Sequence, residues 1–395
     1  MKVTVVGQGY VGLPLGIFAS ESGYTVYGLD NNDEKISLLK SGKSIIEDLS
    51  DEVIKKSVDS KKYLPTVDSS VISDSEVILI CVPTPLSNDH QPDLDALSRA
   101  TATVGKNLKA GALVIVESTI EPGTCRNTLL SILLKESGLK PGEFELAYSP
   151  ERIDPTNKKW SIRNTPKLVA GLTENAAKRA GDFYGRFIDS ITICTSLEIA
   201  ETAKLLENSF RLVNISFINE IAIFCQKIGI DVSEVISAAA TKPYGFMPFY
   251  PSIGAGGHCI PVDPIYLANA AKVVGAPSRF IELADQINQE MPGYYVGRAE
   301  EKLGSLKAKK VLVVGVSYKP NVSDTRESPV ETLIVGLKQK GAQVSWHDDL
   351  VKEWNGEKSV ALSDKYDLAI LATPHDYLDL TKLGNVPILN TRGSI

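Results

Sequence analysis

The sequence predicts an α/β fold in which two parallel sheets, each covered by helices on both faces, are joined by a helical middle segment. Two observations support this prediction. Short β-branched runs alternate with amphipathic stretches near both ends of the chain, as in successive β-α-β units. Between these parts, residues 197–227 form a stretch of 31 residues without Pro or Gly. That stretch predicts one helix of about 46 Å at a rise of 1.5 Å per residue.

The first β-α-β unit begins at the N-terminus. Val3–Val6 is a short β-branched run, and it leads into a glycine-rich turn at Gly7–Gly12. Leu13–Ser22 has helical spacing and stops at Gly23, and Thr25–Leu29 is the next strand. Further strands are expected at the apolar runs that close on Pro, Ser or Thr, namely Val77–Cys81 and Leu113–Val116.

The same pattern returns near the C-terminus. Val311–Val316 resembles the first strand, and Gln343–Trp346 is a second apolar run. Residues 367–374 echo residues 76–83, a weak internal repeat. We therefore expect two Rossmann-like, doubly wound parallel-sheet domains, at 1–196 and 304–395, with a helical domain at 197–303 between them.

The long middle segment has a broad apolar stripe. Its members recur at spacings of three and four residues: Phe210, Val213, Phe217, Ile221 and Phe224. A stripe on so long a helix needs a partner surface. The sequence therefore predicts a dimerisation helix and a homodimer.

Composition excludes several classes of protein. The 395 residues carry 42 Lys and Arg against 48 Asp and Glu, a formal net charge of −6, with 43% hydrophobic and 23% charged residues. These values are typical of a globular chain and not of a disordered or fibrous one. No run of five or more Lys or Arg occurs, so we expect no nucleic-acid partner.

The cysteines indicate a reducing compartment. There are five, an odd number, with no C-x-x-C pair, so neither a disulfide framework nor a zinc site is predicted. Lys2–Val6 runs directly into the glycine turn and leaves no room for a signal peptide. The longest apolar run near it, Val77–Val82, is far shorter than the roughly 20 residues that span a bilayer. We expect a cytoplasmic protein with no membrane partner and no metal.

The glycine turn predicts a dinucleotide site. Gly7, Gly9 and Gly12 follow a strand and open a helix, and Asp30 ends the second strand 18 residues after Gly12. In such a turn the glycines allow a tight bend, close approach of a pyrophosphate and close packing of helix on strand. An Asp at this position accepts hydrogen bonds from ribose hydroxyls and repels a 2′-phosphate, which favours NAD over NADP. The alternative is a merely close-packed β-α turn.

A second glycine-rich segment surrounds a cysteine. Residues 254–264 read GAGGHCIPVDP, so a ligand could come within backbone distance of Cys259. A free thiol is only about 3% thiolate at pH 7 unless a positive group lies near it. Cys259 is therefore either a nucleophile or a small buried apolar residue, and the adjacent His258 is a poor base for it because neighbouring side chains point apart.

The long helix also has a polar stripe. Its members are Glu201, Lys204, Asn208 and Arg211, three or four residues apart. They are either a solvated face or buried groups with partners, because an unpaired buried charge is costly. Lys204 and Asn208 both donate hydrogen bonds and could hold an oxyanion.

These motifs together resemble the nucleotide-sugar 6-dehydrogenases, the relatives of UDP-glucose dehydrogenase. The resemblance covers nearly the whole chain and rests on segments that occur in family order: residues 7–15, 117–119 (EST), 149–152 (SPER), Lys204 with Asn208, 254–263, 315–321 (GVSYKPN) and 324–328 (DTRES). Residues 241–251 with the Gly-His-Cys loop look most like UDP-N-acetyl-D-glucosamine 6-dehydrogenase. The segment 244–251 has no arginine, unlike the UDP-glucose branch, and this is consistent with a different sugar.

The resemblance implies an enzyme that uses two NAD to oxidise the C6 alcohol of a UDP-sugar to a carboxylate. Cys259 would form a thiohemiacetal and then a thioester, and Lys204 and Asn208 would hold the C6 oxyanion. Glu151 and Asp263 match the carboxylates of the site, and we favour Glu151 for activating the hydrolytic water. Surface-polysaccharide synthesis would consume the product.

The resemblance also implies binding residues. Those for NAD are Gly7, Gly9, Tyr10, Val11, Gly12, Asp30, Lys35, Thr84, Thr119 and Arg326, and Thr119 also belongs to the catalytic network. Those for the substrate are Glu151, Arg152, Lys204, Asn208, Gly256, Gly257, Lys319 and Arg392. Lys35, Arg326, Lys319 and Arg392 could instead be exposed surface charges.

Several alternatives remain open at this point. The sugar could be glucose or N-acetylmannosamine. A dehydrogenase that transfers a single hydride needs a Lys but no nucleophilic cysteine. A catalytically silent NAD-binding regulator would keep the glycine turn but has no reason to keep Cys259 with Lys204. A cysteine hydrolase would need a base for Cys259, and nothing in the sequence supplies one.

Overall fold

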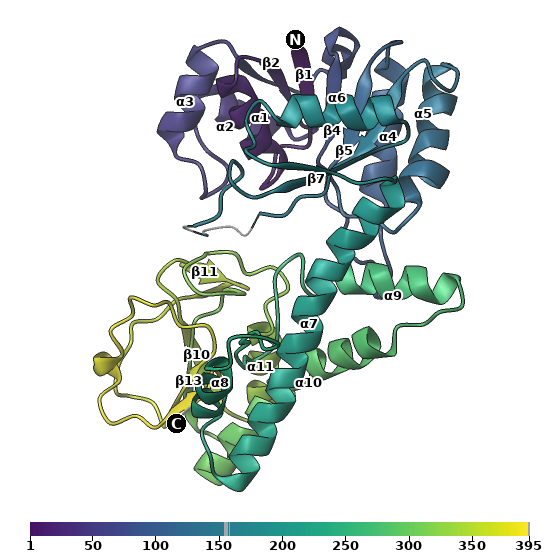
Figure 1. Ribbon diagram of the computed structural model, residues 1–395. Coiled ribbons are helices and arrows are strands. Elements are labelled where there is room, and N and C mark those ends of the chain that lie inside the picture. The colour runs from purple at the N-terminus through teal and green to yellow at the C-terminus, as the bar shows by residue number, and fades with distance from the viewer. Residues whose placement is uncertain (154–156, 158, 394–395) are drawn as a thin grey trace. The chain divides into compact units, whose positions relative to one another are not determined.

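The computed structural model describes residues 1–153, 157 and 159–393. The chain forms two compact units, Met1–Leu206 and Glu207–Ile395. The long helix α7 (Leu197–Ile228) begins in the first unit and continues into the second. Each unit has a sheet of its own (Figure 1).

The first unit is built on an eight-stranded sheet in the order β3-β2-β1-β4-β5-β6-β7-β8. Neighbouring strands are parallel throughout, except that β7 runs antiparallel to β6. The strands are β1 (Lys2–Val6), β2 (Thr25–Leu29), β3 (Tyr63–Thr66), β4 (Val77–Ile80), β5 (Leu113–Val116), β6 (Glu145–Tyr148), β7 (Lys167–Gly171) and β8 (Ile191–Ile193).

Helices cover both faces of this sheet. They are α1 (Gly12–Glu21), α2 (Asp33–Lys40), α3 (Asp51–Asp59), α4 (Asp95–Asn107), α5 (Leu130–Ser137) and α6 (Glu174–Tyr184), with short helical turns at Ser69–Asp74 and Cys125–Leu129. Strand residues alternate between the faces: Leu113 and Ile115 pack with α1 and α6, whereas Val114 and Val116 pack with α4 and α5. The sheet is therefore buried on both sides, which explains its continuous apolar strands.

The second unit has a four-stranded parallel sheet in the order β10-β9-β13-β14. Its strands are β9 (Lys310–Val314), β10 (Gln343–His347), β13 (Leu368–Leu371) and β14 (Ile388–Asn390), and a small hairpin pairs β11 (Glu353–Trp354) with β12 (Glu357–Lys358). The order matches β2-β1-β4-β5 of the first unit, strand for strand. The internal repeat predicted from the sequence is therefore real at the level of topology.

Helices complete the second unit. Besides most of α7 they are α8 (Val232–Ala240), α9 (Asp263–Val273), α10 (Arg279–Leu303) and α11 (Val330–Gln339), with a short turn at Leu380–Leu383. Helices α10 and α11 pack on one face of the sheet through residues such as Val296 and Leu333. Helix α10 ends at Gly304, whose φ of +73° suits a glycine.

The predicted fold class is confirmed, with small shifts at element ends. Helix α7 extends one residue past the predicted segment, α1 begins one residue earlier than predicted and ends at Glu21, and β4 ends one residue earlier than predicted. In the described part of the chain, no helix combines the length and the apolar character needed to cross a membrane.

Candidate active site

The glycine turn after β1 is shaped by backbone crowding. Gly7 has a φ of +94°, and a Cβ there would lie 2.6 Å from the carbonyl oxygen of Cys81. A Cβ on Gly12 would lie 2.0 Å from the carbonyl oxygen of Gly7. The amide of Gly7 donates to the carbonyl of Leu29 at 2.8 Å, so the turn is tied to the second strand. Neither Gly7 nor Gly12 could therefore carry a side chain.

Asp30 lies beside this turn, as the spacing predicts. Its Oδ2 accepts a hydrogen bond from the amide of Gln8 at 2.8 Å, and its Oδ1 accepts one from the amide of Asn32 at 3.0 Å. Each carboxylate oxygen can accept a second hydrogen bond, so the group keeps capacity for ribose hydroxyls. Lys35 Nζ lies 4.0 Å from Asp30 Oδ2, so this predicted basic residue lies next to Asp30.

The turn fits a dinucleotide. A Cβ on Gly9 would meet no atom within 4 Å, so the backbone at Gly9 faces open space that a pyrophosphate can approach. The N-terminus of α1 follows directly, and free amides at a helix N-terminus attract phosphate. Tyr10 is 36% exposed and Val11 half-buried beside this opening. The glycine turn, Tyr10, Val11 and Asp30 would hold NAD, which accepts a hydride when bound.

The other predicted residues of the first unit lie near strand ends. Thr84 is buried just after β4, and Thr119 is half-buried just after β5. Glu151 and Arg152 follow β6. Glu151 Oε1 accepts the amides of Arg152 and Ile153, whereas its Oε2 is buried and has no hydrogen-bond partner among the described residues. That oxygen is a free acceptor for a proton or a donor from a ligand.

The polar stripe of α7 is mostly buried. Glu201 is fully buried, and its carboxylate accepts the amides of Gly123 and Cys125. It therefore has a structural role as a cap. Lys204 is 7% exposed, and Asn208 lies one helical turn further along α7 and is also buried. Arg211 is exposed, so the solvated-face reading applies to that residue alone.

In the second unit, Asn208 and Asp263 meet. Asn208 Nδ2 donates to Asp263 Oδ2 at 2.6 Å, and the Asp263 side chain is buried at the start of α9. The amide of Asp263 in turn donates to the carbonyl of Cys259 at 2.9 Å. The turn that carries Cys259 is thus fixed to two of the predicted catalytic residues.

Cys259 itself is exposed, which rules out the reading of a buried apolar residue. Its glycine loop packs against the segment after β9. A Cβ on Gly256 would lie 2.5 Å from the carbonyl oxygen of Glu327, and one on Gly257 would lie 2.7 Å from the ring of Tyr318. The amide of Gly257 donates to the carbonyl of Arg326 at 3.1 Å. The glycines therefore serve close docking of two loops.

The predicted basic residues of the second unit differ in their surroundings. Arg326 is about half exposed and makes a bidentate ion pair with Asp324, with Nη2 to Oδ2 at 2.6 Å. Lys319 is half-buried in the same segment. Arg392 is half-buried, and burial lowers the pKa of its guanidinium although Asp376 opposes this. A partly desolvated guanidinium is well suited to a phosphate ligand.

The second copy of the glycine turn is closed. The amide of Val316 donates to Asp348 Oδ2 at 3.0 Å, just as Gln8 donates to Asp30. Here, however, His375 Nε2 lies 2.9 Å from Asp348 Oδ1, and both side chains are fully buried. His375 Nδ1 accepts the amide of Asn321, so Nε2 carries the proton and donates to Asp348. Ser317, fully buried, occupies the place of Gly9.

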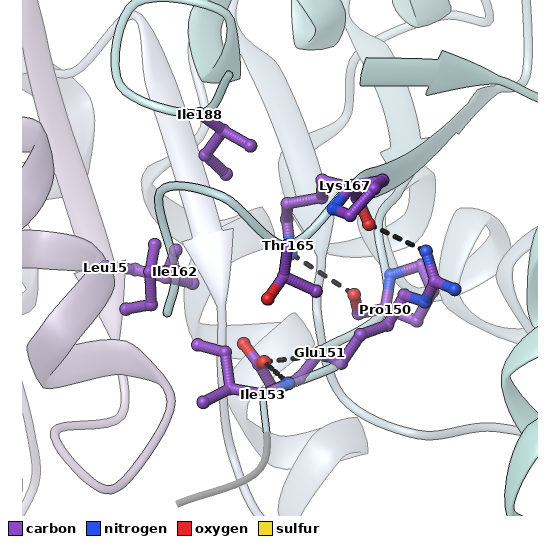
Figure 2. Close-up of a pocket in the computed structure, with 10 residues that line it drawn as sticks. Leu15, Pro150, Glu151, Ile153, Ile162, Thr165, Lys167 and Ile188 are labelled. Carbon is purple, nitrogen blue, oxygen red and sulfur yellow. Dashed lines mark hydrogen bonds between the residues drawn. The ribbon is translucent and has the colours of Figure 1, made fainter. Parts of the chain in front are cut away.

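Sequence reasoning missed one charged cluster. Glu117, fully buried after β5, accepts hydrogen bonds from Lys167 and from the hydroxyl of Tyr184, and the Lys167–Glu117 distance is 2.8 Å. Burial raises the pKa of Glu117 to about 7, although Lys167 opposes the shift. A lysine opening the apolar run 167–171 was the available signal. Lys167 and Glu151 line one small cavity (Figure 2).

Comparison with known proteins gives a consistent result. The UDP-glucose/GDP-mannose dehydrogenase family matches in three parts: its NAD binding domain over residues 1–188, its central domain over 198–290 and its UDP binding domain over 312–391.

Several individual proteins are similar to this chain over most of its length. The chain is 35% identical to a UDP-N-acetyl-D-mannosamine dehydrogenase of Pyrococcus horikoshii and 34% identical to a UDP-N-acetyl-D-glucosamine 6-dehydrogenase of Pseudomonas aeruginosa, each over 95% of this chain and 90% of the relative. A solved UDP-D-ManNAc dehydrogenase of Pyrococcus horikoshii superimposes with a TM-score of 0.91 at 34% identity, covering 99% of this chain and 95% of that one. The chain therefore belongs to the UDP-glucose/GDP-mannose dehydrogenase family, in which it is an NAD-dependent UDP-sugar 6-dehydrogenase.

Proposed function

We propose that the protein oxidises the C6 alcohol of UDP-N-acetylglucosamine to the carboxylate, with Cys259 as the covalent nucleophile. The observation that supports this most directly is the position of Cys259. Its thiol is exposed on a glycine loop, and the turn that holds it is bonded to Asp263, which is bonded to Asn208. A dehydrogenase that transfers one hydride has no use for a cysteine held in this way.

The first half of the proposed reaction forms the covalent bond. The C6 alcohol loses its hydroxyl proton and a hydride, which gives the aldehyde. The Cys259 thiolate then forms a C–S bond to C6, and the aldehyde oxygen becomes the oxyanion of a thiohemiacetal. Lys204 and Asn208 stabilise this oxyanion by donating hydrogen bonds to it.

The second half releases the product. A second hydride leaves C6 and a thioester forms, because the tetrahedral thiohemiacetal can expel hydride where a free aldehyde cannot do so readily. Glu151 takes a proton from water as the water attacks the thioester carbonyl, the C–S bond breaks, and the Cys259 thiolate leaves. Overall, one alcohol, two NAD and one water give one carboxylate, two NADH and three protons.

The assignment of the other groups follows their chemistry. Asp263 positions Asn208 through the 2.6 Å hydrogen bond. Gly7, Gly9, Tyr10, Val11, Gly12, Asp30, Lys35, Thr84, Thr119 and Arg326 bind NAD, and Thr119 also supports the catalytic network. Arg152, Gly256, Gly257, Lys319 and Arg392 contribute to binding of the nucleotide sugar. The free cysteines are consistent with action in the cytoplasm, a reducing compartment.

UDP-N-acetylmannosamine is the second candidate substrate. The similarity to the Pyrococcus horikoshii protein favours it, since 35% identity there compares with 34% to the relative named for N-acetylglucosamine. The two sugars differ only in configuration at C2. The resemblance of residues 241–251 to the N-acetylglucosamine enzymes is the reason we place that sugar first.

We further propose that the protein is a homodimer joined along α7. Phe210, Phe217 and Phe224 are 46%, 58% and 57% exposed, and they recur every seven residues along one side of the helix. Ile228 continues the row and is 54% exposed. A second copy of this chain would cover such a row with the same row, as two-fold interfaces do.

The test is the stoichiometry of NADH across a panel of UDP-sugars. We expect two NADH per molecule of UDP-N-acetylglucosamine at completion, with much lower kcat/KM for UDP-glucose. One NADH per sugar would replace the four-electron proposal by single hydride transfer. A higher kcat/KM for UDP-N-acetylmannosamine would assign that sugar instead.

A further inference from the structure

Three segments far apart in the sequence meet at one edge of the first sheet. Strands β5 and β6 are parallel, so Glu117 and the Pro150–Glu151 segment, which follow them, lie at the same edge. Strand β7 runs antiparallel to β6, so its first residue, Lys167, lies at that edge too. The reversal of chain direction between β6 and β7 thereby places a lysine next to the segment that carries Glu151.

Lys167 connects the other two segments. Its Nζ donates to Glu117 Oε2 at 2.8 Å and to the carbonyl of Pro150 at 3.2 Å. The ammonium also lies 5.0 Å from the centre of the Tyr184 ring, and Tyr184 donates its hydroxyl to Glu117. The Glu117 side chain is fully buried and that of Lys167 is 7% exposed. Lys167 is therefore fixed, and it fixes the peptide directly before Glu151.

Glu151 depends on that peptide for its orientation. Among the described residues, only one of its carboxylate oxygens has hydrogen-bond donors, namely the two amides that follow it in the chain, and those bonds turn with the backbone. Glu151 and Lys167 line the same small cavity, about 10 Å³, which is room for roughly one water molecule (Figure 2). Among the described residues, no side chain donates to the Glu151 carboxylate, which accepts only the two backbone amides.

We infer that Lys167, held by Glu117, is a positioning residue that orients Glu151 for hydrolysis of the thioester. The inference rests on the proposed role of Glu151. Lys167 contacts the turn and not the reacting atoms, so its loss should slow the last step while the binding of both substrates persists.

The experiment removes both buried charges together, because one left alone would be an unpaired charge in the interior. We compare the Lys167→Met/Glu117→Gln double variant with Lys167→Gln/Glu117→Gln, whose shorter neutral side chains can still bond each other, and with Lys167→Arg. The control is Lys178→Met, which changes an exposed lysine on α6. Thermal melting first identifies which double variant is folded, and that variant is used.

We expect the folded double variant to lose at least tenfold in kcat, with Kd for NAD and for UDP-sugar within about twofold of wild type. Intact mass during turnover should show the sugar attached to Cys259, because hydrolysis has become the slow step. Lys167→Arg should recover most of kcat, since a guanidinium donates to both acceptors, and Lys178→Met should match wild type. A folded double variant with wild-type kcat and no adduct overturns the inference.

Glu151→Gln, measured in parallel, separates this inference from the proposed function. If Glu151→Gln accumulates the adduct and the double variant does not, then the role of Lys167 is wrong and that of Glu151 stands. If Glu151→Gln turns over like wild type, Glu151 is not the base, and the inference about Lys167 is overturned with it.

Discussion

Asn208 donates its side-chain amide to the carboxylate of Asp263 at 2.6 Å, with both groups buried. This contact joins α7 to the first residue of α9, whose amide is bonded to the carbonyl of Cys259. Asn208 is therefore linked through a single residue to the turn that holds the thiol. A change at Asn208 should be felt in stability and in catalysis alike.

Replacing Asn208 by Asp removes the hydrogen-bond donor to Asp263 and puts a second carboxylate beside the Asp263 carboxylate. We expect the free energy of unfolding at pH 7 to fall by about 1–3 kcal/mol, because a buried hydrogen bond is lost and like charges meet. Urea unfolding measures this. Asn214→Asp, at a residue whose side-chain amide donates to the carbonyl of Phe210 one turn back, is the control. Equal destabilisation of the two variants would show that the Asp263 contact contributes nothing.

Replacing Cys259 by Ser should abolish turnover but preserve binding of the nucleotide sugar. Only one atom changes, whereas an alkoxide forms far less readily than a thiolate at neutral pH. Steady-state assays should show a loss of at least a thousandfold, and calorimetry an unchanged Kd for UDP-sugar. Wild-type enzyme trapped during turnover should carry the sugar on Cys259 by peptide mass. Near-normal rates for the Ser variant would remove the covalent step.

Asp30 should decide the choice of cofactor. Its carboxylate accepts the amide of Gln8 in the glycine turn, so we expect the 2′-phosphate of NADP to meet a negative charge there and kcat/KM to favour NAD by well over tenfold. Asp30→Ala should narrow that ratio. Asp33→Ala, three residues on and exposed, should leave it unchanged. Equal kcat/KM for the two cofactors in wild type would place Asp30 outside the site.

Phe217 should be essential for self-association. A charge in the middle of the proposed interface row would have no partner, so Phe217→Asp should give a monomer at micromolar concentration in sedimentation velocity, where we expect wild type to sediment as a dimer. Leu38→Asp, at an exposed position on α2, should stay dimeric. Wild type that sediments as a fully active monomer would contradict the interface.

Glu117 should make stability depend on pH. Its pKa is about 7 in the folded chain against an ordinary value of 4.5, chiefly because it is buried. The folded state therefore holds the proton more tightly, and its contribution is fully present below pH 4.5 and is lost as the pH rises through 7. The melting temperature of wild type should fall from pH 5 to pH 8 more steeply than that of Glu117→Gln. Parallel slopes would mean that Glu117 does not titrate in this window.

Local sequence patterns predicted much of the fold. Lys2–Val6 and Thr25–Leu29 are strands because their β-branched runs are bounded by Gly, Asp or a charged end, and α7 is unbroken because no Gly or Pro interrupts it. The glycine turn and Asp30 could be predicted together, because dinucleotide binding needs a glycine turn and an acidic residue at a characteristic separation. The exposure of Cys259 was not, because burial depends on which loops pack against it.

The Glu117–Lys167 pair could not be predicted, for a physical reason. The two residues are 50 positions apart, and they meet only because β7 reverses direction beside β6. The apolar pattern of a strand gives its faces but not its direction. An isolated lysine before an apolar run therefore signals a buried charge only once the sheet is known.

The closed turn at Asp348 has a consequence for the timing of the reaction. His375 donates a hydrogen bond to the Asp348 carboxylate, whereas the Asp30 carboxylate keeps acceptor capacity for ribose hydroxyls. We therefore expect NAD to bind at the N-terminal turn and not at the Asp348 turn. In the proposed reaction the sugar gives up two hydrides. The NAD site must therefore release NADH and bind a second NAD while the sugar is half oxidised. An aldehyde left loose through that exchange could diffuse away. In the proposed reaction, the covalent bond to Cys259 would hold the half-oxidised sugar on the protein during this exchange of cofactor.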